Sequence, residues 1–133
     1  IVDLTETGSS LRANNLRIVD TILTSTTRLI ANKKAWRDKA KRAKIEQLKM
    51  LLTAALDAQK RVLIKLNAPA KKLEKITAAL PALHAPTVNR LNDADWFAVE
   101  SVVEERLVRD LVPVLKAAGA TGIIELPLNK IIF

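Results

Sequence analysis

The feature that most constrains the fold is a change of hydrophobic period along residues 61–127. The segment "RVLIKLNAP" alternates, with Val62, Ile64 and Leu66 on one face. This two-residue period predicts a strand with one buried face. In the next segment, "AKKLEKITAALP", the apolar side chains recur three and four residues apart, which predicts a helix that ends at Pro81.

The same succession of strand and helix signals then continues to the end of the chain. A short strand is predicted in "PTVNRL", a turn in "NDAD" and a longer alternating strand in "WFAVESVV". A helix in "EERLVRDLVPVLKAAG", ending at Gly119, and a last strand in "TGIIELPL" follow. The order strand, helix, strand, strand, helix, strand is the split βαβ, or ferredoxin-like, arrangement. The sequence therefore predicts an α+β fold with a ferredoxin-like βαββαβ domain over residues 61–133.

That predicted domain is small for an independent core. A domain of this size buries only ~60% of the surface that its unfolded chain exposes. One face of its sheet would also carry no helix. We therefore expect it to pack against another domain or against a second copy of itself.

Positive charge gathers in the segment that precedes this domain. The formal net charge is +8, and many of the basic residues crowd into "NKKAWRDKAKRAKIEQLK". Apolar residues at helical spacing share this region: Trp36, Ala40, Ala43, Leu48, Leu51, Leu52 and Ala55. The pattern predicts one long amphipathic linker helix over residues 33–60, with a buried stripe and a solvated basic face. Aromatic residues are too scarce for a stacking surface, so no nucleic-acid partner is predicted.

Composition excludes several other classes. The sequence has no cysteine, which excludes disulfides and thiolate metal sites and fits a reducing, cytoplasmic location. No apolar run approaches the ~20 residues of a membrane span, so no membrane partner is predicted. The first residues show no basic stretch followed by an apolar run, so we expect no signal peptide.

The opening stretch, "IVDLTETGSSLRANNLRIVDTI", reads as a strand end, a polar turn and a helix. The apolar positions Leu11, Ile18 and Ile22 predict a helix from about Ser9. A glycine turn before a helix lets the backbone approach an anion, and the helix N-terminus offers free N–H donors. "TGSS" also fits a plain N-cap, so the residues alone leave both interpretations open.

The side chains around that glycine suit a sugar phosphate. The hydroxyl groups of the turn can donate to phosphate oxygens, whereas Asp3 and Glu6 suit sugar hydroxyls or Mg²⁺. Arg12 lies in the first predicted turn of the helix, where a cation opposes the helix dipole. A nearby anion would explain its position.

The segment "DLTETGSSLRANNL" resembles the phosphoribosyl-pyrophosphate loop of the ATP phosphoribosyltransferase family, which acts first in histidine biosynthesis. The matching positions are Asp3, Glu6, Thr7, Gly8, Ser10, Leu11, Asn15 and Leu16. "STTRLIANKKAW" resembles the strand that follows the loop helix in that family. "APTVNRL", "DADWFAVESVV" and "LKAAGATGIIELPLNKII" resemble its C-terminal regulatory domain. The resemblance thus divides the chain into a catalytic-domain remnant (1–32), a linker helix (33–60) and a histidine-binding regulatory domain (61–133).

The resemblance implies a glycosyltransferase that joins ATP to phosphoribosyl pyrophosphate with Mg²⁺, forms a homohexamer and is inhibited by L-histidine. It implies a phosphoribosyl-pyrophosphate site at Asp3, Glu6, Thr7, Gly8, Ser9, Ser10 and Leu11, with residues 7–10 on the 5′-phosphate. It implies a histidine site at Asn67, Leu83, Ala85, Thr87, Val102 and Gly122. Ser10 replaces the usual threonine, and Asn67 replaces an acid that in some members could pair with the histidine amino group. No catalytic acid or base and no metal ligand is assigned.

Family members also have an N-terminal half, with most of the ATP site, that this sequence lacks. Because enzymes lower barriers by about 8–23 kcal/mol, one anion-binding turn is insufficient, and the chain alone is predicted not to be catalytically competent. A type I phosphoribosyltransferase is one alternative, although such enzymes usually have two adjacent acids where this sequence has Asp3 and Leu4. A stand-alone amino-acid-sensing module without catalysis is the second. A basic nucleic-acid-binding domain, with steeply salt-dependent affinity, is the third.

Overall fold

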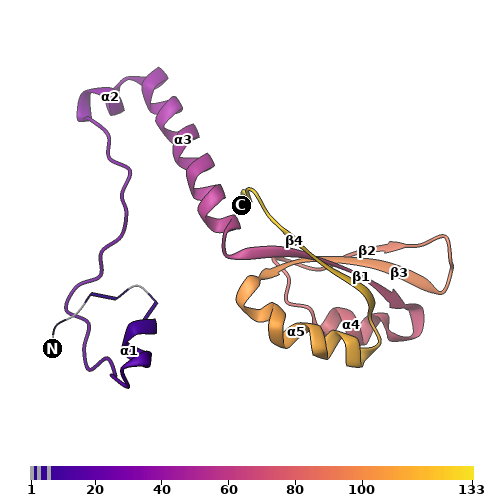
Figure 1. Cartoon of the computed structure of the whole chain (residues 1–133). Coiled ribbons are helices and arrows are strands. Elements are labelled where there is room, and N and C mark those ends of the chain that lie inside the picture. The colour runs from indigo at the N-terminus through magenta and orange to yellow at the C-terminus, as the bar shows by residue number, and fades with distance from the viewer. Residues whose placement is uncertain (1, 3, 6) are drawn as a thin grey trace. The chain divides into compact units, whose positions relative to one another are not determined.

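The computed structural model describes all residues of the chain except Ile1, Asp3 and Glu6. It divides into two compact units, Ile1–Ile30 and Ala31–Phe133, which are described separately (Figure 1). None of the helices within the described residues is both long enough and apolar enough to cross a membrane.

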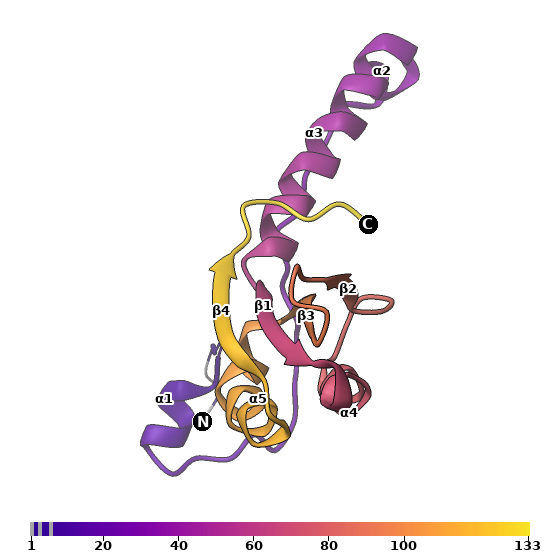
Figure 2. The ribbon, with the colours of Figure 1, turned by 90° about the vertical axis from the view of Figure 1, so that its right-hand side faces the viewer.

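The second unit contains the predicted ferredoxin-like module. Its described residues form an antiparallel sheet in the order β2-β3-β1-β4 (Figures 1 and 2). The strands are β1 (Arg61–Pro69), β2 (Thr87–Arg90), β3 (Trp96–Glu104) and β4 (Thr121–Pro127). The connecting helices are α4 (Leu73–Ala79), which follows a 3₁₀ turn at Ala70–Lys72, and α5 (Glu105–Ala118). The βαββαβ order confirms the prediction.

Helices α4 and α5 cover the same face of this sheet and close the core (Figures 1 and 2). Alternate residues of β1 and β3 are buried on that face, as the two-residue period predicted. Ile76 of α4 and Leu115 of α5 are 0% exposed. Each such side chain contributes about 1.5–3 kcal/mol of hydrophobic stabilisation. The hydroxyl of the buried Ser101 donates to the carbonyl oxygen of Pro81 at 2.7 Å, so this polar group is paired.

The segment predicted as one helix over residues 33–60 forms two helices, α2 (Lys33–Arg37) and α3 (Lys39–Ala58). Asp38 separates them, because its backbone is extended and its carboxylate accepts hydrogen bonds from the N–H groups of the next helix. Aspartate is a favoured N-cap residue, so α3 begins there. The predicted buried stripe is also wrong within this chain, since Leu48 and Leu52 are 49% and 55% exposed.

The first unit contains a single turn of helix, α1 (Ser9–Ala13), where a helix up to Ile22 was predicted. Asn15 adopts the left-handed conformation with φ 54°. The N–H of Leu16 donates to the carbonyl oxygen of Leu11 at 2.8 Å, and that of Asn15 to the carbonyl oxygen of Arg12 at 3.1 Å. These two bonds form a Schellman motif, which closes the helix.

Residues 16–32, all of which the structure describes, form neither helix nor strand. The strand predicted in "STTRLIANKKAW" is therefore absent. A strand needs a neighbour to pair its N–H and C=O groups. No described strand of this chain pairs with that segment, and its last residues, from Lys33 on, belong to α2.

Candidate functional site

The polar turn before α1 is built by hydroxyl groups. Thr5 Oγ1 accepts a hydrogen bond from the N–H of Gly8 at 2.9 Å, and the hydroxyls of Thr7 and Ser9 are hydrogen-bonded at 2.9 Å. Among the described residues no side chain caps α1. The turn is therefore stabilised by its own side chains, and Thr7 Oγ1 also accepts a hydrogen bond from the N–H of Ser9, the first residue of α1, at 3.4 Å.

Gly8 is the residue on which the turn most depends. Its φ of 68° lies in the left-handed region, which disfavours most residues that have a Cβ atom. A Cβ atom at this position would lie 3.4 Å from Nη1 of Arg12, so the guanidinium lies beside the turn. The structure thus brings a positive charge to the glycine. Because α1 ends at Ala13, Arg12 also lies in its last turn, where a cation suits the helix dipole, so the argument that its position requires an anion is wrong.

The turn gathers hydroxyl groups, an open backbone and a guanidinium, which together can bind an anion. Of the predicted loop residues, Thr7 and Gly8 lie in the turn itself, and Ser9, Ser10 and Leu11 lie in α1. Asp3 and Glu6 lie outside the described residues. The part of the chain that the structure describes contains no group of three His, Cys, Asp or Glu residues that could hold a metal ion.

The second candidate site is the face of the sheet opposite α4 and α5, which we call the open face. Residues paired across neighbouring strands share a face, so the register defines its members. They include Leu63, Lys65 and Asn67 of β1, Thr87 and Asn89 of β2, Ala98, Glu100 and Val102 of β3, and Ile124 and Leu126 of β4, with the pairs Arg61–Glu104 and Pro69–Trp96 at the two ends. Gly122 lies at a register shift of β4 and joins this face because a Cβ atom there would approach the side chain of Asn67.

Four of the six predicted histidine-site residues lie on the open face, one on each strand: Asn67, Thr87 and Val102 by the strand register, and Gly122 by its closeness to Asn67. Gly122 has φ 55°, and a Cβ atom there would lie 3.3 Å from Nδ2 of Asn67. The Asn67 amide can therefore approach the backbone of β4 closely because residue 122 is glycine. The other two predicted residues, at positions 83 and 85, are exposed in the segment that joins α4 to β2.

An ion pair that sequence reasoning missed lies at the centre of the open face. Nζ of Lys65 is 2.8 Å from Oε1 of Glu100, and the two side chains are partly exposed. Such a pair contributes at most about 1 kcal/mol to stability. Its chemistry is more informative, because a carboxylate and an ammonium side by side can bind the two charged ends of an amino acid. The alternation of both strands placed these residues on one side, but it did not fix their register.

Comparison with known proteins gives consistent matches to both units. The family model described as HisG, C-terminal domain matches residues 58–130, and the model described as ATP phosphoribosyltransferase matches residues 1–54. Proteins named ATP phosphoribosyltransferase from Pelotomaculum thermopropionicum and Chlorobium phaeobacteroides are 56% and 57% identical to 99% of this chain. The matched region is 46% and 45% of those proteins, so the chain spans about half the length of the curated relatives it matches.

Proposed function

The chain belongs to the HisG C-terminal domain family, and we propose that it is the C-terminal part of an ATP phosphoribosyltransferase. The full-length protein, called the parent below, would transfer phosphoribosyl from phosphoribosyl pyrophosphate to ATP in the first step of histidine biosynthesis. One observation carries this proposal: the turn at Gly8 and the ferredoxin-like module occur in one chain, each matched by its family model in that order.

The turn at Gly8 would hold the 5′-phosphate of phosphoribosyl pyrophosphate. The hydroxyls of Thr7, Ser9 and Ser10 would donate to phosphate oxygens, and the guanidinium of Arg12 would neutralise their charge. Asp3 and Glu6 would contact the ribose hydroxyls. The reaction displaces pyrophosphate at a sugar carbon, so the loop contributes by holding that carbon in position for attack.

Magnesium would neutralise charge on the departing pyrophosphate. The described residues contain no cluster of ligands that fits the ion.

The chain alone would lack activity because most of the catalytic half lies outside it. Large apolar side chains of residues 16–32 are exposed: Leu16, Ile18, Val19, Ile22, Leu23, Leu29 and Ile30. Exposed apolar side chains in such number mark a surface that is covered in the complete protein. We infer that the missing half of the parent covers them.

The open face would bind L-histidine and inhibit the parent. Glu100 and Lys65 offer charges for its amino and carboxyl groups, and Asn67 offers an amide in place of the acid of some relatives. Thr87 and Gly122 are exposed and Val102 is half-buried, so a second surface must enclose a ligand there. The proposal therefore includes contact between modules in a homohexamer. It also includes a cytoplasmic location, which the absence of cysteine fits.

Calorimetric titration of the parent tests both halves of the proposal. We expect heat with phosphoribosyl pyrophosphate plus Mg²⁺ and, separately, with L-histidine. Gly8→Val should abolish the first signal and keep the second. Glu100→Gln should weaken the second and keep the first, which makes the two variants controls for each other.

The outcomes separate the proposal from its alternatives. Heat from neither ligand would overturn the proposal. Heat from L-histidine alone would favour the stand-alone amino-acid-sensing module, an alternative that the complete core of the ferredoxin-like module supports.

A further inference from the structure

Residues 128–133, which we call the strap, return from the sheet to the last turns of α3. Strand β4 ends at Pro127, which pairs with Val62 at the start of β1. The chain therefore leaves the sheet at the end where α3 enters it. The N–H of Ile131 then donates to the carbonyl oxygen of Ala54 at 3.0 Å. The strap lies beside α3 in both views of the ribbon (Figures 1 and 2).

A second attachment joins the strap to the start of β1. The guanidinium carbon of Arg61 lies 5.1 Å from the centre of the Phe133 ring, within the range of a cation–π contact. Nη1 of Arg61 also donates to the carbonyl oxygen of Asp57 in α3 at 3.0 Å. One side chain thus ties the end of α3 to the strap, across the short connection Gln59–Lys60.

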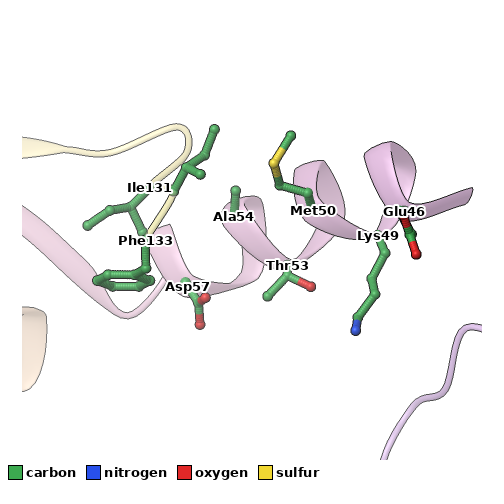
Figure 3. A pocket seen from close by; sticks show the side chains of 9 residues that line it. Glu46, Lys49, Met50, Thr53, Ala54, Asp57, Ile131 and Phe133 are labelled. Atoms are coloured by element: carbon green, nitrogen blue, oxygen red, sulfur yellow. The ribbon is translucent and has the colours of Figure 1, made fainter. Parts of the chain in front are cut away.

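The contact between strap and helix is close at one point and open beyond it. The buried residues of α3 are Ala54 and Ala58, 2% and 1% exposed, and their small side chains let the neighbouring chain approach. Farther along, a cavity of about 470 Å³ separates Met50 and Thr53 from the strap (Figure 3). Phe133 is 75% exposed. Two attachments beside an unfilled cavity make a contact that can open without disturbing the core.

We propose that the strap is a latch that holds α3 in one direction relative to the ferredoxin-like module and carries the regulatory signal between them. The border between the two family matches, residues 54–58, falls at this latch. By those matches α3 is largely catalytic and β1 is regulatory. This inference rests on the proposed function, because it concerns how a ligand of the open face affects the catalytic part.

The path from the open face to the latch is a single strand. Gly122, Ile124 and Leu126 of β4 lie on the open face, and the chain then passes directly into the strap. A ligand or second module that binds to β4 would therefore change the position of the residue from which the strap begins. For such an effect the latched and open arrangements must differ in their affinity for that ligand.

Two variants of the parent release the latch, and two leave it closed. Phe133→Ala removes the ring that Arg61 covers, and Arg61→Met removes the guanidinium. Phe133→Trp keeps an aromatic ring, and Lys130→Ala changes an exposed strap residue. We expect the two releasing variants to raise the L-histidine concentration for half-inhibition roughly tenfold or more, a typical size for coupling between sites. Turnover without L-histidine should stay at the level of the parent.

Two further measurements test the latch and its signalling role separately: calorimetry of L-histidine binding and hydrogen exchange of the Ile131 amide. The dissociation constant of L-histidine should rise together with the concentration for half-inhibition, because the latched and open arrangements differ in affinity. The amide of Ile131 should exchange faster in Phe133→Ala than in Lys130→Ala. Unchanged inhibition in a releasing variant that still binds L-histidine would overturn the signalling role. Equal exchange of Ile131 in the two variants would overturn the latch itself. Absence of any L-histidine binding by the parent would instead contradict the proposed regulatory function, and the exchange comparison would still decide whether the latch exists.

Discussion

The ferredoxin-like module and residues 1–32 contain similar apolar side chains but bury them very differently. In the module, β1, β3, α4 and α5 contribute to one continuous core. In residues 1–32 none of the described residues is buried, and Leu23 and Ile30 are 83% and 88% exposed. Composition therefore does not separate the two regions. The module has both layers of its fold within the chain, whereas the described part of residues 1–32 buries none of its apolar side chains.

The difference in burial predicts that a substitution in the core of the module will cause the largest loss of stability. Leu115→Ala should lower the free energy of unfolding of the chain by about 2–5 kcal/mol, because it leaves a cavity at a fully buried site. Leu23→Ala, the matched control, should change it by less than about 0.5 kcal/mol. Urea denaturation of both variants measures the difference. Equal losses would mean that the two regions are packed alike, against the structure.

The Leu23→Ala substitution, which should hardly affect the stability of the chain, should destabilise the parent. If the missing half covers residues 16–32, Leu23→Ala should destabilise the catalytic domain of the parent by about 2 kcal/mol or more. Thermal unfolding of the parent with and without the substitution measures this. A neutral result in both proteins would show that Leu23 remains exposed in the complete enzyme.

Gly8 and Gly122 both have left-handed backbones, so substituting each by alanine compares the two regions directly. Gly122→Ala should destabilise the chain by about 1–2 kcal/mol, because a Cβ atom is strained at its φ of 55° and approaches the Asn67 amide. Gly8→Ala should leave the unfolding transition of the chain unchanged, since its turn contacts no core. In the parent it should instead weaken binding of phosphoribosyl pyrophosphate, measured by calorimetry. An equal loss of stability from both substitutions would contradict this division.

The smallest expected effect is electrostatic and lies at the edge of the module. A hydrogen bond from Arg106, its charge and then the charge of Arg61 lower the pKa of Glu104. This carboxylate therefore adds stability above its unfolded-state pKa, and loses it as the pH falls through its lower folded-state pKa. Arg106→Gln should raise the pKa of Glu104 towards its ordinary value, followed by NMR titration. A pKa that does not move would mean that the contact is not formed in solution.

The strands and helices of the module could be predicted because their burial repeats with the period of each element. The alternation of Val62, Ile64 and Leu66 reports one buried face directly. The register between paired strands could not be predicted in the same way. The pairing of Lys65 with Glu100 depends on how far β3 slides along β1, and a two-residue period allows several such positions.

Helix ends were harder to predict, because single residues decided them. Leu11, Ile18 and Ile22 fit a longer helix, but Asn15 enters the left-handed region and closes α1 after one turn. Asp38 lies within the basic segment that precedes the module, and its carboxylate caps α3. In both places a local hydrogen-bonding option outweighed the apolar spacing.

The central claim is that the module is complete within this chain whereas residues 16–32 are part of a larger domain. Amide hydrogen exchange, measured on the chain and on the parent, tests this most directly. We predict that amides of β1, β3 and α5 exchange slowly in both proteins, and that residues 16–32 exchange quickly in the chain but are protected in the parent. Fast exchange of residues 16–32 in both proteins, or slow exchange of them in the chain alone, would contradict the account.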